Sequence, residues 1–395
     1  MPQLKLMFCT MSTGILGGRE KVFADKVNYL YHTKNYDLYI VTTNQGGSEN
    51  FYSIDLCKEK QFDLNVDYHD IELLNPVKRL MARRKLRQIH QQKLSEIIAQ
   101  VMPDVIVINS TDELFFLNKI KGKAKLIFEE HTGFRFSRKM EINHIYTGFN
   151  MYLRLIRWKL LDSKIEKKLK NFDKIICLTN AARKMHDCSI HSKIEVLGNP
   201  LSSCFENYQF ATKKKHIIAV GRLSFEKRYD MLLKACHLII DKCDGWTFHL
   251  YGDGPELDDL KMQANSLGIS EIFFFHPAQE DILSIYQEAS ICVITSLFES
   301  YSMVITEAMS QEVACISVKC PTGPMELIDN GKTGILLDDS DVIKLSNAIL
   351  HLINNPDLRN EIGINARKSV RHCYLKPIMH QYQNILMELA LSSRK

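Results

Sequence analysis

The stretch FESYSMVITEAM (298–309) carries two carboxylates, Glu299 and Glu307, eight positions apart with no other charge between them. The apolar run before it is typical of a strand, and helical spacing begins near Ser302. We therefore predict Glu299 in a loop and Glu307 about one turn inside a helix. The first-turn amides near Ser300–Val304 would form an anion pocket at the start of that helix.

A phosphate in this pocket would repel both glutamates, so we predict that they accept hydrogen bonds from neutral hydroxyls, such as those of sugars. The loop AVGRLSFEKRYD (219–230) supplies two cations, Arg222 and Lys227, between a strand and a helix. Fixed cations at such a loop neutralise a diphosphate well. Together these residues indicate a nucleotide-sugar site, although each pair taken alone could be surface charge.

Two stretches of the first half add candidates. LIFEEHTGF (126–134) ends a strand with His131, and active-site residues of open α/β sheets gather at the carboxyl ends of strands. A lone histidine can also be purely structural. STGILGGRE (12–20) leads through Gly17 and Gly18 into a helix whose N-terminus favours an anion. Its glycine spacing is not the G-x-G-x-x-G of a dinucleotide site, and a plain strand-to-helix turn remains an alternative.

The elements that must position these residues alternate along the whole chain. Short, almost wholly apolar runs such as DVIVINS are separated by segments of helical spacing, among them 77–101, 228–242 and 340–353. Such runs predict parallel sheets buried on both faces. The fold class that follows is α/β, with two doubly wound Rossmann-like domains facing a central cleft.

The polar stretch 197–216 suggests the domain boundary. We predict an N-terminal acceptor-side domain of residues 1–200 and a C-terminal nucleotide-sugar donor domain of residues 201–376. The final helix, about 377–395, could pack back onto the first domain.

Charge differs between the two halves of the 395 residues. Residues 1–200 carry 32 Lys and Arg against 22 Asp and Glu, a net of +10, and the rest carry 19 against 24, a net of −5. The basic stretches 77–88 and 153–170 have helical spacing and interleaved apolar residues, which suits either an anionic membrane surface or a solvated basic face. Without a recognised module, nucleic acid is not an expected partner.

The N-terminus lacks the apolar stretch of a signal peptide, and no apolar run is long enough to span a membrane. The expected location is therefore cytoplasmic, peripheral on the inner face of the plasma membrane. The eleven cysteines are scattered, and no C-x-x-C pair occurs. Asp339 and Asp341 form a D-x-D before a helix, where acids are routine caps. No metal and no cofactor are expected.

Four motifs, GRLSFEK, GDGPEL, FESYSMVITEAM with its E-x7-E spacing, and PTGPMELI, occur in one order in the second half. Together with the glycines before residue 20, they resemble the family 4 retaining glycosyltransferases of the GT-B type (glycosyl transferases group 1). The resemblance runs from GILGGRE to residue 337, most of the chain. It implies a metal-independent hexosyltransferase that keeps the anomeric configuration.

The resemblance also implies roles for individual residues. Arg222 and Lys227 would bind the donor diphosphate, Glu299 the hydroxyls of the donor sugar, and Glu307 the ribose. The remaining positions would lie along the donor or the reacting sugar: Gly17, Gly18, His131, Ser300, Tyr301, Ser302 and Met303.

Two positions depart from the family pattern, since Ser300 and Glu312 stand where relatives commonly have glycine. A non-glycine residue in a left-handed helix end costs on the order of 1 kcal/mol, so the turn at Glu312 is expected to close differently. These substitutions leave the shape of the donor-sugar pocket open.

The function expected is transfer of a hexose or N-acetylhexosamine, with UDP favoured as the nucleotide because of the PTGPMELI loop. The acceptor would be a saccharide or a lipid-linked oligosaccharide of a surface polysaccharide such as lipopolysaccharide or capsule. A UDP-sugar 2-epimerase-like GT-B enzyme is one alternative, and a non-catalytic subunit that binds nucleotide sugars or carbohydrate is another. The sequence leaves the donor sugar, the linkage and the oligomeric state open.

Overall fold

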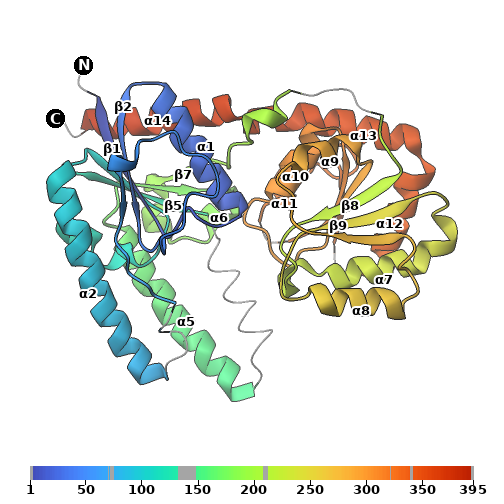
Figure 1. Cartoon of the computed structure of the whole chain (residues 1–395), viewed down its shortest axis with the longest axis horizontal. Helices are drawn as coiled ribbons and strands as arrows, with labels where there is room; N and C mark the ends of the chain where they lie inside the picture. The colour runs from blue at the N-terminus through green and yellow to red at the C-terminus, as the bar shows by residue number, and fades with distance from the viewer. Residues whose placement is uncertain are drawn as a thin grey trace. The chain divides into compact units, whose positions relative to one another are not determined.

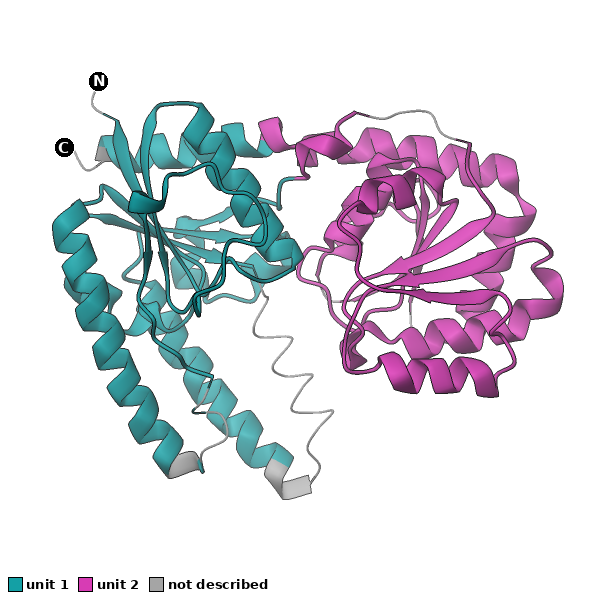
Figure 2. Cartoon of the chain, viewed as in Figure 1, with its two compact units in different colours: residues 1–200, 378–395 teal, residues 201–377 magenta. Residues whose placement is uncertain are grey.

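The computed structural model describes residues 3–69, 71, 75–131, 148–207, 212–320, 322–338 and 341–392. Contacts divide it into two compact units, shown in Figure 2. Unit 1 comprises residues 1–200 and 378–395, and unit 2 comprises residues 201–377. The last helix, α14 (Leu375–Ser392), belongs to unit 1 from residue 378 onward. Pro321 and Asp339, which the sequence motifs included, lie outside the described residues.

In the described residues of unit 1, one parallel sheet has the strand order β3-β2-β1-β4-β5-β6-β7 (Figure 1). Its strands are short, and the central strand β4 is wholly apolar, as expected of a sheet covered on both faces. The strands are β1 (Leu4–Thr10), β2 (Tyr36–Thr42), β3 (Gln61–Asp63), β4 (Val105–Ile108), β5 (Lys125–Glu130), β6 (Lys174–Cys177) and β7 (Ile194–Val196).

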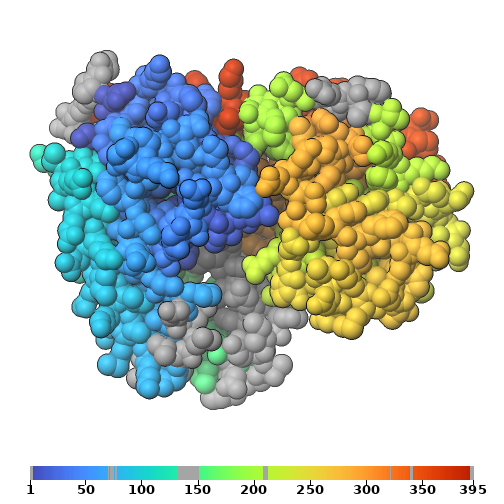
Figure 3. All heavy atoms as spheres, in the orientation of Figure 1, coloured from blue at the N-terminus to red at the C-terminus, as the bar shows by residue number. Residues whose placement is uncertain are grey.

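The helices of unit 1 include two long ones, α2 and α5, whose inward faces join β1, β4 and β5 in one buried apolar cluster. Asn75 caps α2 by accepting a hydrogen bond from the backbone amide of Lys78. The α2 helix (cyan) forms part of the outer surface of this unit in Figure 3. The helices are α1 (Gly18–His32), α2 (Pro76–Val101), α3 (Leu117–Ile120), α5 (Gly148–Leu169) and α6 (Asn180–Lys184).

Unit 2 repeats the design, with a parallel sheet of strand order β10-β9-β8-β11-β12-β13 among its described residues. Helices α7, α8 and α12 cover one face, and their apolar side chains form the core with the inward residues of the strands. The strands are β8 (His216–Val220), β9 (Thr247–Tyr251), β10 (Phe273–His276), β11 (Ile291–Ile294), β12 (Ala314–Val318) and β13 (Ile335–Leu337). The helices are α7 (Tyr229–Ile239), α8 (Leu257–Ser266), α9 (Ile282–Glu288), α10 (Met303–Ser310), α11 (Pro324–Leu327), α12 (Val342–Asn354) and α13 (Pro356–Ser369).

Each sheet reverses its winding direction at one point. In unit 1 the reversal lies between β1 and β4, and in unit 2 it lies between β8 and β11. Open parallel sheets bind ligands beyond the carboxyl ends of the strands at this point. The loops that follow β1, β4, β8 and β11 are therefore where ligand-binding residues are expected.

The predicted fold class, two doubly wound α/β domains, agrees with these sheets. The predicted helices 77–101, 228–242 and 340–353 correspond to α2, α7 and α12 within a few residues. Asp341 caps α12 by accepting from the amides of Ile343 and Lys344, as expected of an acid at a helix start. None of the helices in the described part of the chain is long and apolar enough to cross a membrane.

Candidate active site

The loop after β8 is held by close backbone contact with the loop after β9. Gly221 has a φ of 147°, in the region that favours glycine, and its amide donates to the carbonyl of Tyr251 at 3.0 Å. A Cβ at Gly252 would lie 1.9 Å from the Gly221 carbonyl oxygen, and one at Gly254 would lie 2.3 Å from that of Leu223. The GDG motif is therefore glycine-rich because these two loops leave no room for side chains.

Lys227 and Glu299 form an ion pair within unit 2. The Lys227 Nζ lies 2.7 Å from Oε1 of Glu299, and the hydroxyl of Ser296 donates to the same oxygen at 2.7 Å. The side chains are only 19 and 12% exposed. Burial lowers the pKa of Lys227, but the charge and hydrogen bond of Glu299 outweigh this effect and leave the pKa raised.

This pair ties together the loops after β8 and β11. Besides the ion pair, the hydroxyl of Thr295 donates to the carbonyl of Lys227 at 2.6 Å, and the amide of Leu297 donates to the carbonyl of Glu226 at 2.7 Å. The sequence assigned Lys227 to phosphate and Glu299 to sugar hydroxyls, as separate groups. In the structure they are in direct contact at the point where the sheet reverses.

Arg222 lies on the same loop, and its side chain is exposed. Among the described residues no ion pair involves its guanidinium, whereas Lys227 is paired. The two predicted diphosphate ligands therefore differ in their contacts. Arg222 is exposed and can bind an anion from solvent, whereas Lys227 must share its charge with Glu299.

The segment between Glu299 and α10 forms the start of the predicted anion pocket. Tyr301 and Ser302 are buried, and Ser302 precedes α10 with a left-handed φ of 71°. Helix α10 begins at Met303, as predicted, so its first-turn amides lie next to this segment. The carbonyl of Glu299 accepts a hydrogen bond from the hydroxyl of Thr322 in the loop after β12.

Glu307 lies on α10 and is half-buried. One carboxylate oxygen accepts a hydrogen bond from the hydroxyl of Tyr286 on α9 at 3.0 Å. Burial raises the pKa of Tyr286 well above its ordinary value, so the phenol keeps its proton and remains a donor. The two glutamates thus have different local partners, a cation for Glu299 and a neutral phenol for Glu307.

The two departures from the family pattern differ in backbone conformation. Ser300 is not in the left-handed region, so its Cβ causes no backbone strain there. Glu312 has a φ of 57°, which is the left-handed conformation that glycine adopts at a helix end. The expectation that this turn closes differently is therefore wrong, because the glutamate takes the conformation at a cost on the order of 1 kcal/mol.

In unit 1, His131 follows β5 and contacts Glu129, which is itself ion-paired with Lys26. Its Nε2 lies 2.9 Å from Oε2 of Glu129, whose Oε1 lies 2.5 Å from Nζ of Lys26. Burial raises the pKa of Glu129, but Lys26 and then His131 hold it well below its usual range. An ionised carboxylate only accepts, so Nε2 of His131 donates to Glu129, and Nδ1 is an acceptor when the ring carries a single proton.

The Nδ1 atom of His131 is buried and has no hydrogen-bond partner among the described residues. A cavity of about 10 Å³ adjoins it, lined by Asn199 and Tyr382 among others, and has room for about one water. A free acceptor at the carboxyl end of a strand is available to a hydroxyl group. The structure thus gives His131 an oriented ring, as a ligand-binding histidine requires.

Gly17 and Gly18 lie at the start of α1, as the sequence predicted. Gly17 has extended backbone (φ −175°), and a Cβ there would lie 2.4 Å from Oε2 of Glu20. A side chain at residue 17 would therefore require the Glu20 carboxylate to move, while the extended backbone itself does not require glycine. The preceding loop is fixed by Gln45, whose Oε1 accepts from the amide of Thr13 at 3.0 Å.

A larger pocket of about 570 Å³ lies beside this loop in unit 1. Its lining is rich in hydroxyl, amide and carboxylate groups, which suit a ligand with many hydroxyls. The sequence analysis missed it, although the polar run TTNQGGSEN directly after β2 was a signal for it. Among the lining residues are Thr13, Thr42, Gln45, Ser48, Asn50, Gln61 and Asp63.

Glu113 is a second residue that the sequence did not single out. It follows β4, next to the reversal point of the sheet, and is fully buried. Burial raises its pKa to about 7, and burial lowers the pKa of the nearby His90 to about 4. The two side chains, 3.7 Å apart, are therefore both neutral between these pH values.

The loops after β8, β9 and β11 lie in the part of the chain that matches a family model. Residues 204–369, all within unit 2, match the family model described as Glycosyl transferases group 1. This part of the chain is similar to that family, and the resemblance predicted from the motifs is confirmed.

Relatives extend the similarity over the whole chain. An uncharacterised glycosyltransferase of Haemophilus influenzae is 24% identical over 97% of this chain and 99% of its own length. An α-1,4-N-acetyl-D-galactosaminyltransferase of Campylobacter jejuni, whose name gives an undecaprenol-linked GalNAc substrate, is 23% identical over 98% of this chain and 99% of its own length.

Solved structures show the same fold. The crystal structure of Anabaena HepE in complex with UDP has a TM-score of 0.71 at 17% identity, covering 98% of this chain and 100% of that one. The predicted GT-B fold class is confirmed by this likeness and by the two parallel sheets.

Proposed function

We propose that this chain is a retaining, metal-independent glycosyltransferase of surface polysaccharide or lipid-linked oligosaccharide biosynthesis. It moves a hexose or N-acetylhexosamine from a nucleotide sugar, most simply a UDP-sugar. One observation carries the proposal. Arg222, Lys227 and Glu299 lie on the loops after β8 and β11 where the sheet of the family-matching unit reverses, Lys227 and Glu299 are in contact, and Glu307 lies on α10 directly after the second loop.

In this proposal some of these groups bind the charged diphosphate of the nucleotide sugar, and the others bind its neutral hydroxyls. The exposed guanidinium of Arg222, the ammonium of Lys227 and the first amides of α10 bind the diphosphate. Glu307, held by a neutral phenol, accepts hydrogen bonds from the ribose hydroxyls. Glu299 accepts from the hydroxyls of the donor sugar while its other side stays on Lys227.

The proposed reaction breaks the bond between the anomeric carbon and the diphosphate oxygen and forms one from that carbon to an acceptor hydroxyl. The acceptor proton passes to the leaving phosphate oxygen, so no separate protein base is required. Arg222 and Lys227 stabilise the charge that develops on the diphosphate. His131 accepts a hydroxyl hydrogen bond at Nδ1 and orients the reacting sugar, because Glu129 fixes its ring.

UDP and the acceptor class rest on the chemistry of the relatives. HepE is a structural neighbour crystallised with UDP, and the Campylobacter relative is named for a lipid-linked GalNAc substrate. For the acceptor saccharide we propose the polar pocket beside Thr13 and Asn50, since its hydroxyl and amide groups match those of a sugar. No nucleic acid is proposed as a partner.

We further propose a cytoplasmic enzyme that binds the membrane surface peripherally. Helix α5 exposes apolar residues, Tyr152 and Leu160 among them, next to exposed basic residues. On α2, Leu80 and Met81 are exposed in the same way. Arg87 of α2 is, however, paired with Asp112 at 2.7 Å, so part of the basic face is already neutralised. Such helices suit an anionic lipid surface.

A donor screen tests the function. The full chain is incubated with UDP-, GDP- and ADP-sugars and a pool of lipid-linked acceptors, and released nucleoside diphosphate is measured. We expect release with a UDP-sugar that depends on the acceptor, and a higher melting temperature with UDP alone. If no nucleotide sugar raises the melting temperature or releases diphosphate, the enzymatic proposal fails. Retention on vesicles with anionic lipid at low salt tests the membrane proposal separately.

A further inference from the structure

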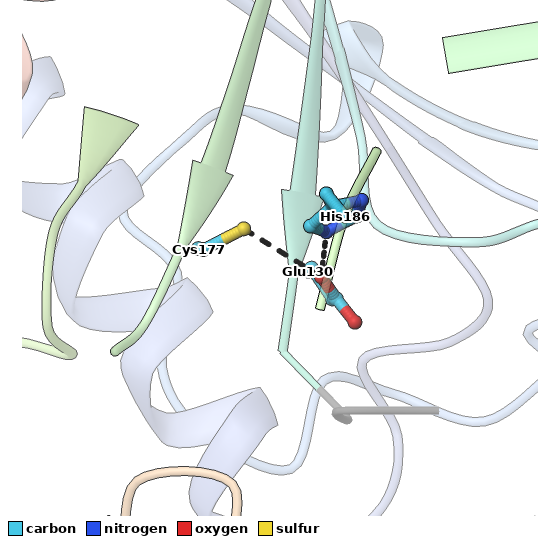
Figure 4. Close-up of side chains that lie close together, drawn as sticks. All are labelled: Glu130, Cys177 and His186. Atoms are coloured by element: carbon cyan, nitrogen blue, oxygen red, sulfur yellow. Dashed lines mark hydrogen bonds and ion pairs between the residues drawn. The ribbon is translucent and has the colours of Figure 1, made fainter. Parts of the chain in front are cut away.

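Three side chains of metal-binding type meet in unit 1. They are Glu130 at the end of β5, Cys177 at the end of β6, and His186 just after α6 (Figure 4). All three are buried, and their ligand atoms lie within 4.8 Å of one another. The Glu130 Oε2 atom is 2.8 Å from Nε2 of His186 and 3.6 Å from Sγ of Cys177. The cluster therefore presents one oxygen, one nitrogen and one sulfur to a common point.

The scaffold fixes this meeting. Glu130 and Cys177 are direct partners in the parallel register of β5 and β6, so the sheet itself holds them side by side. His186 is fixed through its backbone, since its amide donates to the carbonyl of Arg183 at 3.2 Å and its carbonyl contacts Nε2 of His191 at 3.0 Å. Ligands on rigid elements need little rearrangement to bind an ion.

A fourth residue orients the histidine. Nδ1 of His186 lies 2.8 Å from Oε1 of Glu166 on α5, and the second oxygen of that carboxylate accepts from the amide of Asp187 at 3.1 Å. Metal-ligating histidines almost always donate their other ring N–H to such a group, which fixes the tautomer and raises the basicity of the ligating nitrogen. Here the contact turns Nε2 toward Glu130 and Cys177.

The sulfur–oxygen distance of the cluster fits a tetrahedral ion. With metal–nitrogen and metal–oxygen bonds of about 2.0–2.1 Å and a metal–sulfur bond of about 2.3 Å, ligand atoms lie about 3.4 Å (N to O) and about 3.5 Å (S to O) apart. The observed sulfur–oxygen distance is 3.6 Å. The nitrogen–oxygen distance of 2.8 Å is that of a hydrogen bond, and it must open by about 0.6 Å when the ion replaces the proton.

We propose that Glu130, Cys177 and His186 bind a zinc ion, with Glu166 hydrogen-bonded behind the histidine. A mixed thiolate, imidazole and carboxylate set suits Zn²⁺ rather than Mg²⁺ or Ca²⁺, which prefer oxygen alone. Binding replaces the protons on Sγ and Nε2 by one divalent ion. Without zinc, a neutral thiol, an imidazolium and the two carboxylates of Glu130 and Glu166 have a net charge of −1. With zinc, the thiolate, the neutral imidazole, the same two carboxylates and the divalent ion also sum to −1.

The zinc would link Glu130, the last residue of β5 and the neighbour of His131, to β6 and to the segment after α6. It lies wholly within unit 1 and takes no part in donor binding by unit 2, so it stands whether or not the proposed transferase activity is correct. No sequence motif predicted this site, because the ligands are 47 and 9 positions apart and form no C-x-x-C motif.

The test uses the full chain. Protein is treated with a chelator, desalted, supplied with ZnSO₄, desalted again and analysed for zinc. We expect about one equivalent in the wild type and in a variant with the exposed Cys57, Cys188 and Cys204 all changed to Ser. We expect loss of that zinc in Cys177→Ser. Glu166→Gln should retain the site but weaken zinc about 10–100-fold.

Cobalt gives a readout that needs no folded Cys177 variant. Co²⁺ added to the chelator-treated triple-serine variant should produce a thiolate-to-cobalt charge-transfer band in the near ultraviolet, abolished by excess Zn²⁺. Absence of this band together with uptake of far less than one equivalent of zinc would overturn the proposal. Equal zinc in folded Cys177→Ser and wild type would do the same, and would mean an adventitious ion.

Discussion

The ion pair of Lys227 and Glu299 makes a specific prediction for nucleotide binding. At the observed 2.7 Å and an effective dielectric constant of about 20, the two charges attract by about 6 kcal/mol before desolvation is counted. A diphosphate must therefore share Lys227 with Glu299. When a phosphate and a carboxylate bind the same ammonium group, their charges lie on the order of 5 Å apart. At an effective dielectric constant between that of the site and that of water, they repel each other by about 1 kcal/mol.

Two variants separate these terms. Lys227→Ala removes a charge-assisted hydrogen bond worth about 1.5–3 kcal/mol, so Kd for UDP should rise about 10–100-fold. Glu299→Gln keeps the lysine and removes the repulsion, so Kd for UDP should fall about fivefold. Transfer by Glu299→Gln should nevertheless slow at least about 100-fold, because the amide no longer serves the donor sugar as a charged acceptor.

Isothermal titration with UDP measures the affinities, and diphosphate release measures transfer. Lys214 and Glu288 form an exposed ion pair at 2.6 Å in the same unit and provide the matched control, since Lys214→Ala and Glu288→Gln should change neither quantity. The reasoning is refuted if Glu299→Gln weakens UDP as much as Lys227→Ala does. That result would mean that the pair is needed to shape the site rather than competing with the ligand.

Three other variants follow from the same structure. Glu307→Ala should raise Kd for UDP about tenfold and leave the affinity for inorganic diphosphate unchanged, as titration with both ligands would show. Gly254→Ala should lower stability by about 1–3 kcal/mol in urea unfolding, because its Cβ would lie 2.3 Å from the Leu223 carbonyl oxygen; an unchanged midpoint would contradict the close packing. Glu113 has a folded pKa of about 7, raised above the unfolded value of 4.5, so the folded chain binds the extra proton and stability falls as pH rises through this window. The free energy of unfolding of Glu113→Gln minus that of the wild type should therefore be about 3 kcal/mol larger at pH 8 than at pH 4.5. Measuring the Tm of both proteins at the two pH values checks this difference.

The sequence predicted the fold and the local position of most candidate residues. The wholly apolar run Val105–Ile108 could only be a strand covered on both faces, and the change of period near Ser302 located the start of α10. Such signals are local, because helix and strand periodicities are read from neighbouring residues. The order of the strands and the reversal points were not predicted, because they depend on pairing between strands that are far apart in the sequence.

Contacts between distant residues could not be predicted in the same way. Lys227 and Glu299 are 72 positions apart, and only the register of β8 and β11 brings their loops together. Glu113 looked like an ordinary acid after a strand, and its raised pKa comes from burial that no local pattern reveals. The backbone at Glu312 was mispredicted because propensity favours glycine there, and the close approach of Gly363 to the Glu312 carbonyl is a contact that the local sequence does not reveal.

The glycines of the loops after β8 and β9 show how sequence motifs and contacts between distant residues combine. The sequence offered GDGPEL only as one of four motifs, and the structure gives the physical reason for its glycines: Gly252 and Gly254 let the loop after β9 touch the backbone at Gly221 and Leu223. That contact fixes the path of the segment from Gly221 to Lys227. Because Lys227 is in turn bonded to Glu299, an added methyl group at residue 254 would displace an ion pair that it never touches. The motifs thus act as one unit, in which glycines set the backbone and the charged pair joins two loops at the point where the sheet reverses.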